Sequence, residues 1–182
     1  MRRVRYGVGM SLDGYIAGPA GELGYLVSDP TYDQRAFFAG VDTVLMGRRT
    51  YEVALRHGGG QFPGLRAYVF SRTLRPADHP GVTVVAGEAA DVVAGLRAEA
   101  EGKDIWLAGG GDLLAGLLAA GLVDTVEVGI SPVLLGQSGT PMLAPALPAP
   151  ARLALTRSQA YPSGLMVAEY AVRGPAGGAG AA

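Results

Sequence analysis

The stretch Trp106-Leu107-Ala108-Gly109-Gly110-Gly111-Asp112-Leu113-Leu114 decides the fold. An apolar run that is typical of a buried strand precedes the glycines, and a run rich in Leu and Ala, typical of a helix, follows them. The glycines would let a ligand approach the backbone closely, and the helix N-terminus would offer free N–H groups to a phosphate. The alternative is a tight turn that Asp112 caps. The spacing is not that of a Rossmann motif, because Leu114 stands where the third glycine would be.

Strands and helices alternate on both sides of this stretch. Apolar or alternating runs predict strands at 4–11, 42–47, 67–71, 82–85, 105–108, 123–131, 152–159 and 165–172. Helices are predicted at 31–39, 48–55, 89–101 and 112–120, the first of them beginning after Ser28-Asp29-Pro30. This order predicts an α/β fold with a mostly parallel sheet, helices on both faces and antiparallel strands at one end.

Length and composition exclude several classes of protein. A chain of 182 residues predicts one domain, at 1–173, and the Gly, Ala and Pro of 174–182 predict a disordered tail. The chain has no cysteine, which excludes disulfides and thiolate metal sites, and we expect no metal site. A net charge of -1 provides no basic field for nucleic acid or for an anionic membrane. We therefore expect neither of these partners. No apolar run approaches the ~18 residues of a membrane span, and the N-terminus lacks the apolar segment of a signal peptide, so we expect a cytoplasmic protein.

Two further junctions between a strand and the segment after it could hold an anion. The segment Gly47-Arg48-Arg49-Thr50 puts two arginines in the first turn of a predicted helix, where they oppose the helix dipole unless an anion is present. Ser71 and Arg72 follow the next predicted strand, and a hydroxyl beside a guanidinium is suited to the 2′-phosphate that distinguishes NADP from NAD. Three such junctions fit a ligand with several phosphates, such as NADPH; the alternative for the arginines is an ordinary surface position.

With these junctions in order, the chain resembles the dihydrofolate reductase-like family, in its branch related to the reductase (C-terminal) domain of the bacterial riboflavin biosynthesis deaminase-reductase. Five segments carry the resemblance: Ser11–Ala17, Met46–Glu52, Tyr68–Thr73, Gly109–Leu114 and Pro132–Gly136. The resemblance implies a three-layer sandwich built on a mixed, mostly parallel eight-stranded sheet, with bound NADPH. It also implies a homodimer.

The resemblance also implies site residues. Those expected to bind the cofactor are Gly47, Arg48, Arg49, Thr50, Ser71, Arg72, Gly109, Gly110, Gly111, Asp112 and Leu113. Those expected near the nicotinamide and the substrate are Ser11, Asp13 and Tyr15. Two family features are missing. The acid of dihydrofolate reductase would fall at Thr31, and the glutamate of the riboflavin reductases would fall at Ala108.

We therefore expect an NADPH-dependent reductase that passes hydride to a C=N or C=O of a small heterocycle, pterin-like or pyrimidine-like. Its proton would come from Asp13, Asp29 or Asp33, or from a water near Tyr15, with Asp13 and Asp33 taken as the catalytic candidates. The alternative for Asp13 is a turn residue without a catalytic role, and the alternative for Asp33 is a solvated residue on the helix surface. The alternative function is a non-catalytic module that binds or senses NADPH, which the absence of an evident proton donor favours.

Overall fold

The computed structural model describes residues 1–60, 62–136, 140–141 and 147–173, so the predicted tail at 174–182 lies outside the described residues. The elements are β1 (Val4–Ser11), β2 (Tyr15–Ala17), α1 (Gln34–Ala39), β3 (Val41–Gly47), α2 (Arg48–Arg56), β4 (Arg66–Phe70), η1 (Pro76–Asp78), β5 (Thr83–Val85), α3 (Ala89–Ala98), β6 (Asp104–Gly109), α4 (Gly111–Ala119), β7 (Thr125–Ser131), β8 (Thr140–Pro141), β9 (Arg152–Ala160) and β10 (Met166–Arg173).

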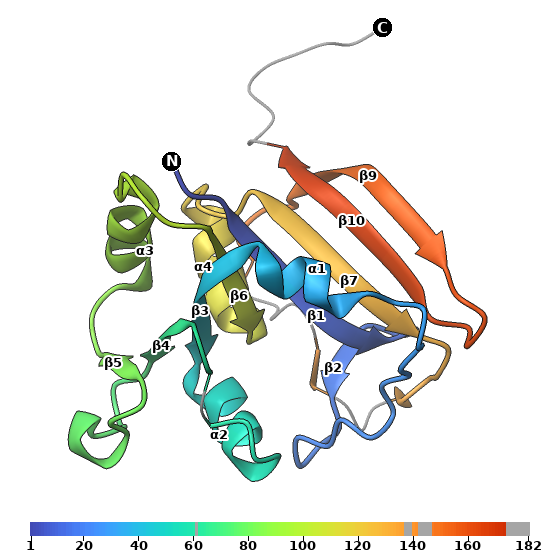
Figure 1. Cartoon of the computed structure of the whole chain (residues 1–182), viewed down its shortest axis with the longest axis horizontal. Helices are drawn as coiled ribbons and strands as arrows, with labels where there is room; N and C mark the ends of the chain where they lie inside the picture. The colour runs from blue at the N-terminus through green and yellow to red at the C-terminus, as the bar shows by residue number, and fades with distance from the viewer. Residues whose placement is uncertain (61, 137–139, 142–146, 174–182) are drawn as a thin grey trace, which may run out of the picture.

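Eight strands form one sheet in the order β5-β4-β3-β6-β1-β7-β10-β9 (Figure 1). The pairs from β5 to β7 are parallel, and β10 and β9 are antiparallel to their neighbours. The strand and helix pattern of the sequence is confirmed, and so is the mixed, mostly parallel sheet. A separate pair, β2 with β8, lies outside this sheet.

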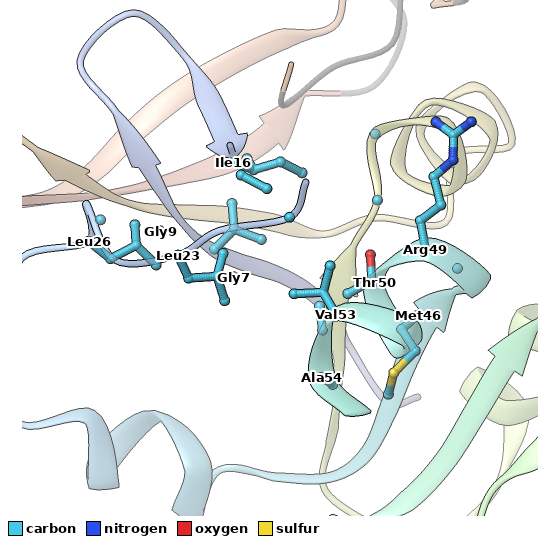
Figure 2. Close-up of a pocket in the computed structure, with 18 of the residues that line it drawn as sticks. Gly7, Gly9, Ile16, Leu23, Leu26, Met46, Arg49, Thr50, Val53 and Ala54 are labelled. Carbon is cyan, nitrogen blue, oxygen red and sulfur yellow. The ribbon is translucent and has the colours of Figure 1, made fainter. Parts of the chain in front are cut away.

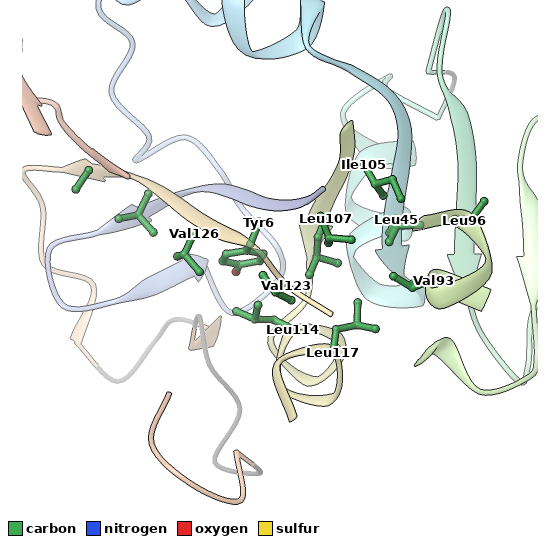
Figure 3. Packing of buried hydrophobic residues seen from close by; sticks show 13 residues of the cluster. Tyr6, Leu45, Val93, Leu96, Ile105, Leu107, Leu114, Leu117, Val123 and Val126 are labelled. Atoms are coloured by element: carbon green, nitrogen blue, oxygen red, sulfur yellow. The ribbon is translucent and has the colours of Figure 1, made fainter. Parts of the chain in front are cut away.

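Helices cover both faces of the sheet. On one face, Val93 and Leu96 of α3 and Leu114 of α4 pack against buried sheet residues such as Tyr6 and Leu107 (Figure 3). On the other face, α1 and α2 pack against the neighbouring side chains of the same strands (Figure 1). Successive strand residues point to opposite faces, so the chain builds both layers from one set of strands.

The first helix is shorter than the sequence predicts. It begins at Gln34 and not at Thr31, with Asp33 as the N-cap whose side chain accepts a hydrogen bond from the Arg35 N–H. The residues before it form a turn around Asp29, whose carboxylate accepts from the backbone N–H of Thr31. A side chain that binds the backbone in this way competes with the first helical turn, and this explains the later start.

No helix within the described part of the chain is long and apolar enough to cross a membrane.

Candidate functional site

The three predicted anion junctions lie at one edge of the sheet. They follow β4, β3 and β6, which are neighbours, and all three strands run in the same direction. In the register, Met46 is opposite Gly109 and Gly47 is opposite Phe70. A Cβ on Gly47 would be 3.7 Å from the backbone nitrogen of Gly110, so two of the junctions are in close contact. We call this edge the junction rim.

A cleft of about 1440 Å³ opens at the junction rim and extends across the sheet. Figure 2 shows Leu23 and Leu26 on one side of it and Val53 of α2 on the other. Gly7 and Gly9 of β1 lie in its floor, and a Cβ on either would be 2.8 Å from the side chain of Phe37 or Leu26, respectively. Because a small-molecule pocket is usually ~300–1000 Å³, the cleft has room for a cofactor and a substrate together.

Two helix N-termini face the cleft with their first N–H groups available. The N-caps are Gly47 for α2 and Gly110 for α4, and within the described chain no side chain caps either helix. The turn before α4 is therefore not capped by Asp112, which is exposed in the first helical turn. Such N-termini bind anions through free N–H groups and the helix dipole.

The arginines of the first turn of α2 differ in their surroundings. Arg48 donates to Glu52 Oε1 at 2.7 Å, one helical turn further on. Arg49 is exposed, and Figure 2 shows its guanidinium extending away from the floor. With Thr50 beside it, Arg49 can supply charge and hydrogen bonds to a phosphate at the rim.

Gly109 is required at its position by two independent features. Its φ is +125°, which side chains rarely tolerate, and a Cβ would be 3.3 Å from Thr50 Oγ1. The peptide bond to Gly110 is cis. The glycine turn and the first turn of α2 thus approach each other more closely than any other residue type would allow.

Ser71 and Arg72 lie at the same rim but not in the lining of the cleft. Ser71 is buried, and its Oγ accepts from the N–H groups of Thr73 at 3.2 Å and Leu74 at 3.0 Å. The Arg72 side chain is 82% exposed, with a guanidinium nitrogen 3.4 Å from Glu88 Oε1. Exposed ion pairs contribute little, so Arg72 remains available to an anion.

In the described chain, the segment expected near the substrate forms hydrogen bonds that hold two loops together. Asp13 accepts hydrogen bonds from the N–H groups of Leu135 and Gly136 and from the Ser11 hydroxyl. The Ser11 hydroxyl and these backbone groups hold the pKa of Asp13 below its usual range. The lining of the cleft includes Ile16 but not Ser11, Asp13 or Tyr15. Asp13 is therefore ionised, and its position does not favour a role as proton donor.

The other two candidate acids also lie outside the cleft lining. Asp29 accepts from the Thr31 hydroxyl at 2.5 Å and from the Ser163 N–H at 3.0 Å, and these bonds lower its pKa well below the usual range. Asp33 caps α1. Both belong to a separate small depression at residues 28–35. None of the proposed acids reaches the cleft, because each one holds a turn or a helix end.

Glu127 of β7 is a cleft residue that the sequence analysis missed. It is 6% exposed and lines the floor beside Gly129. The Tyr32 hydroxyl donates to its Oε1 at 3.2 Å, and Arg157 donates to its Oε2 at 3.3 Å. A charged residue inside the alternating run 123–131 was the available signal, because it shares a face with Gly129.

Trp106 of β6 is also part of the cleft lining. The indole Nε1 donates to the Gly7 carbonyl at 2.9 Å. The rings of Phe37 and Phe38 meet it edge to face, with centroids 6.0 Å and 5.2 Å away. Tyr51 of α2 is buried, and its hydroxyl is 3.2 Å from His79 Nδ1.

The topology and the cleft together define an α/β protein with the dihydrofolate reductase-like fold. The chain belongs to the RibD C-terminal domain family, whose model matches residues 2–167. This confirms the resemblance drawn from the five sequence segments.

Known proteins similar to the chain extend over most of its length. The uncharacterized protein YyaP of Bacillus subtilis is 31% identical over 157 residues, which cover 78% of this chain and 80% of YyaP. A putative riboflavin biosynthesis protein from Shewanella sp. PV-4 is 26% identical, has a TM-score of 0.79, and is matched over 94% of this chain and 99% of that one. Dihydrofolate reductase from Enterococcus faecalis, complexed with NADP(H), has a TM-score of 0.64 at 14% identity, over 93% of this chain and 96% of that one, and shares the fold.

Proposed function

We propose that the protein is an NADPH-dependent reductase that transfers hydride to a C=N or C=O of a small heterocyclic substrate. The observation that carries the proposal is the pair of uncapped helix N-termini at one rim of a cleft large enough for two ligands. The names of similar proteins support it, since one is named a putative riboflavin biosynthesis protein and a dihydrofolate reductase with NADP(H) shares the fold.

The proposed cofactor residues divide into three groups along the junction rim. Gly47 to Thr50 would bind phosphate through the α2 N-terminus and Arg49, and Gly109 to Leu113 through the α4 N-terminus. Asp112 would contribute its backbone N–H, because its side chain is a carboxylate. Arg72, placed by the turn at Ser71, would bind the 2′-phosphate. NADPH, when bound, supplies the hydride.

The chain itself would orient the substrate and exclude water. Phe37 and Leu26 pack over Gly7 and Gly9 of the floor, and with Trp106 they give the cleft an apolar lining that suits a planar ring. The segment Ser11–Ala17 borders this region through Ile16 and remains the proposed edge of the substrate site. Since the carboxylates of Asp13, Asp29 and Asp33 are engaged elsewhere, we propose that water supplies the proton. The homodimer remains a prediction from the resemblance.

The proposal is tested by titrating the purified protein with NADPH, followed by fluorescence, and then by measuring NADPH absorbance loss with pterins, pyrimidines and quinones. Arg49→Ala should weaken NADPH binding by about tenfold, the value of a hydrogen bond to a charged group. Arg152→Ala removes the same charge on β9, at the far edge of the sheet, and should bind normally. Binding without turnover on any substrate would favour the non-catalytic module, and no binding would overturn both functions.

A further inference from the structure

Glu127 is placed where it can contact a bound ring but not the cofactor phosphates. It projects from β7 on the cleft side of the sheet, in register with Gly7 of β1. Two strands, β6 and β1, separate β7 from β3 at the junction rim. At ~4.8 Å per strand spacing, Glu127 is about 14 Å along the sheet from the N-terminus of α2. The cleft thus has guanidinium groups and helix N-termini at one end and a carboxylate at the other.

The carboxylate of Glu127 has acceptor capacity to spare. A carboxylate offers about four lone-pair sites, and within the described chain the hydrogen bonds to Glu127 are those of Tyr32 and Arg157. Their lengths, 3.2 and 3.3 Å, are long for bonds to a charged acceptor. Burial raises the pKa of Tyr32 to about 12, and the nearby carboxylate adds to this, so its hydroxyl keeps its proton and stays a donor.

Glu127 lies beside a second carboxylate. Glu169 of β10 is directly opposite Glu127 in the sheet, and like charges in such a pair are destabilising. Among the described residues, Arg157 forms ion pairs with both carboxylates, at 3.3 Å from Glu127 and 3.5 Å from Glu169. A ligand that brings donors or positive charge to Glu127 would offset this cost.

Phe37 packs over Gly7, which is opposite Glu127 in the sheet, and Leu165 lies near Gly129; both side chains line the cleft. A planar ring with an N–H edge would contact these apolar side chains with its face and the carboxylate of Glu127 with its edge. We infer that Glu127 is a substrate-recognition residue, which selects heterocycles that present adjacent N–H donors, neutral or cationic, over rings that present only carbonyl oxygens. This inference rests on the proposed function for the presence of a substrate in the cleft.

The test uses two probes of one shape, 2-aminobenzimidazole, which has adjacent N–H donors, and 2-methylbenzimidazole, in which a methyl group replaces the amino group. Binding to the full chain with and without NADPH is measured by calorimetry or by saturation-transfer NMR. We expect the amino probe to bind better to the parent protein. Glu127→Gln should reduce its affinity by about tenfold or more and leave the methyl probe unchanged.

Glu169→Gln is the matched control, because it removes the same charge from a side chain that does not line the cleft, and it should keep the preference for the amino probe. NADPH affinity, measured separately, should be the same in Glu127→Gln and the parent. Three results would overturn the inference: no preference in the parent, an unchanged preference in Glu127→Gln, or a parallel loss of NADPH affinity in that variant. If Glu127→Gln does not fold, the comparison of the two probes on the parent protein is the test, and equal affinities for the two probes would overturn the inference. Failure of the parent to bind NADPH would instead count against the proposed function.

Discussion

Gly109 illustrates how a single residue controls the junction rim. Gly109→Ala must place a Cβ at a φ of +125° and 3.3 Å from Thr50 Oγ1. We expect a loss of about 1–3 kcal/mol in unfolding free energy, measured by urea denaturation, since strain of this kind costs that much. The control is Gly116→Ala in the interior of α4, where a Cβ meets nothing within 4 Å among the described atoms. Gly116→Ala should stabilise the protein by up to about 1 kcal/mol. Equal changes in unfolding free energy for the two variants would contradict this explanation.

Arg72 carries the prediction about cofactor choice. Its side chain is 82% exposed beside the turn that Ser71 holds, so a 2′-phosphate can displace the pairing with Glu88. Arg72→Ala should lower NADPH affinity by about tenfold and leave NADH affinity unchanged. Fluorescence titration of both cofactors measures this, with Arg152→Ala as the charge-matched control. If the parent protein binds NADPH and NADH equally well, the assignment of Ser71 and Arg72 is wrong.

At the scale of elements, an ion cluster joins the end of α3 to the sheet. Glu99 follows α3 and accepts two hydrogen bonds from Arg66 of β4, at 2.9 and 2.6 Å. It also pairs with Arg2, which is buried before β1. The hydrogen bonds from Arg66 lower the pKa of Glu99 to about 2, from a usual value of 4.5. The cluster lies at the edge of the sheet opposite the junction rim, so it stabilises the fold without contacting the cleft.

The lowered pKa sets the direction of a pH effect. The contribution of Glu99 to stability is fully present above pH 4.5 and is lost as the pH falls toward about 2. Glu99→Gln should therefore be less stable than the parent at pH 7, and the gap should narrow as the pH falls through that range. Urea denaturation at pH 7, 5 and 3 measures this. Glu101→Gln, at an exposed position, should show no such trend. A gap that stays constant down to pH 3 would contradict the assignment.

At the scale of the whole molecule, the cleft is lined by residues from β1, β2, β3, β4, β6 and β7 and from α1, α2 and α4. A cofactor that binds there and not to the unfolded chain stabilises all of these contacts together. At 100 times its Kd, NADPH should add about 2.7 kcal/mol, which raises Tm by roughly 5–10 °C for a chain of this length. Differential scanning calorimetry measures the shift. The Arg49→Ala variant at the same NADPH concentration should show a smaller shift, and an unchanged Tm in the parent would contradict cofactor binding.

The local signals in the sequence were sufficient for much of the fold. The apolar runs and the glycine turn at 109–111 predicted the strands, the helices on both faces and the parallel direction. Parallel strands place their carboxyl ends at one edge of the sheet, so the strand pattern alone predicts that the junctions at Gly47 and Gly109 lie together. The start of α1 was predicted too early, because the carboxylate of Asp29 binds Thr31 and Ser163, and Ser163 is far away in the chain.

The amino-acid sequence by itself determined the periodicity of the elements, the glycines that permit close approach and the order of the anion junctions. These depend on neighbouring residues, and backbone geometry is decided locally. Only the tertiary structure decided what each carboxylate contacts. Asp13 and Asp29 are bound to distant backbone N–H groups, whereas Glu127 is brought to the cleft floor by the pairing of β7 with β1. The environment of a charged side chain is set by contacts between segments far apart in the chain, and no local pattern encodes them.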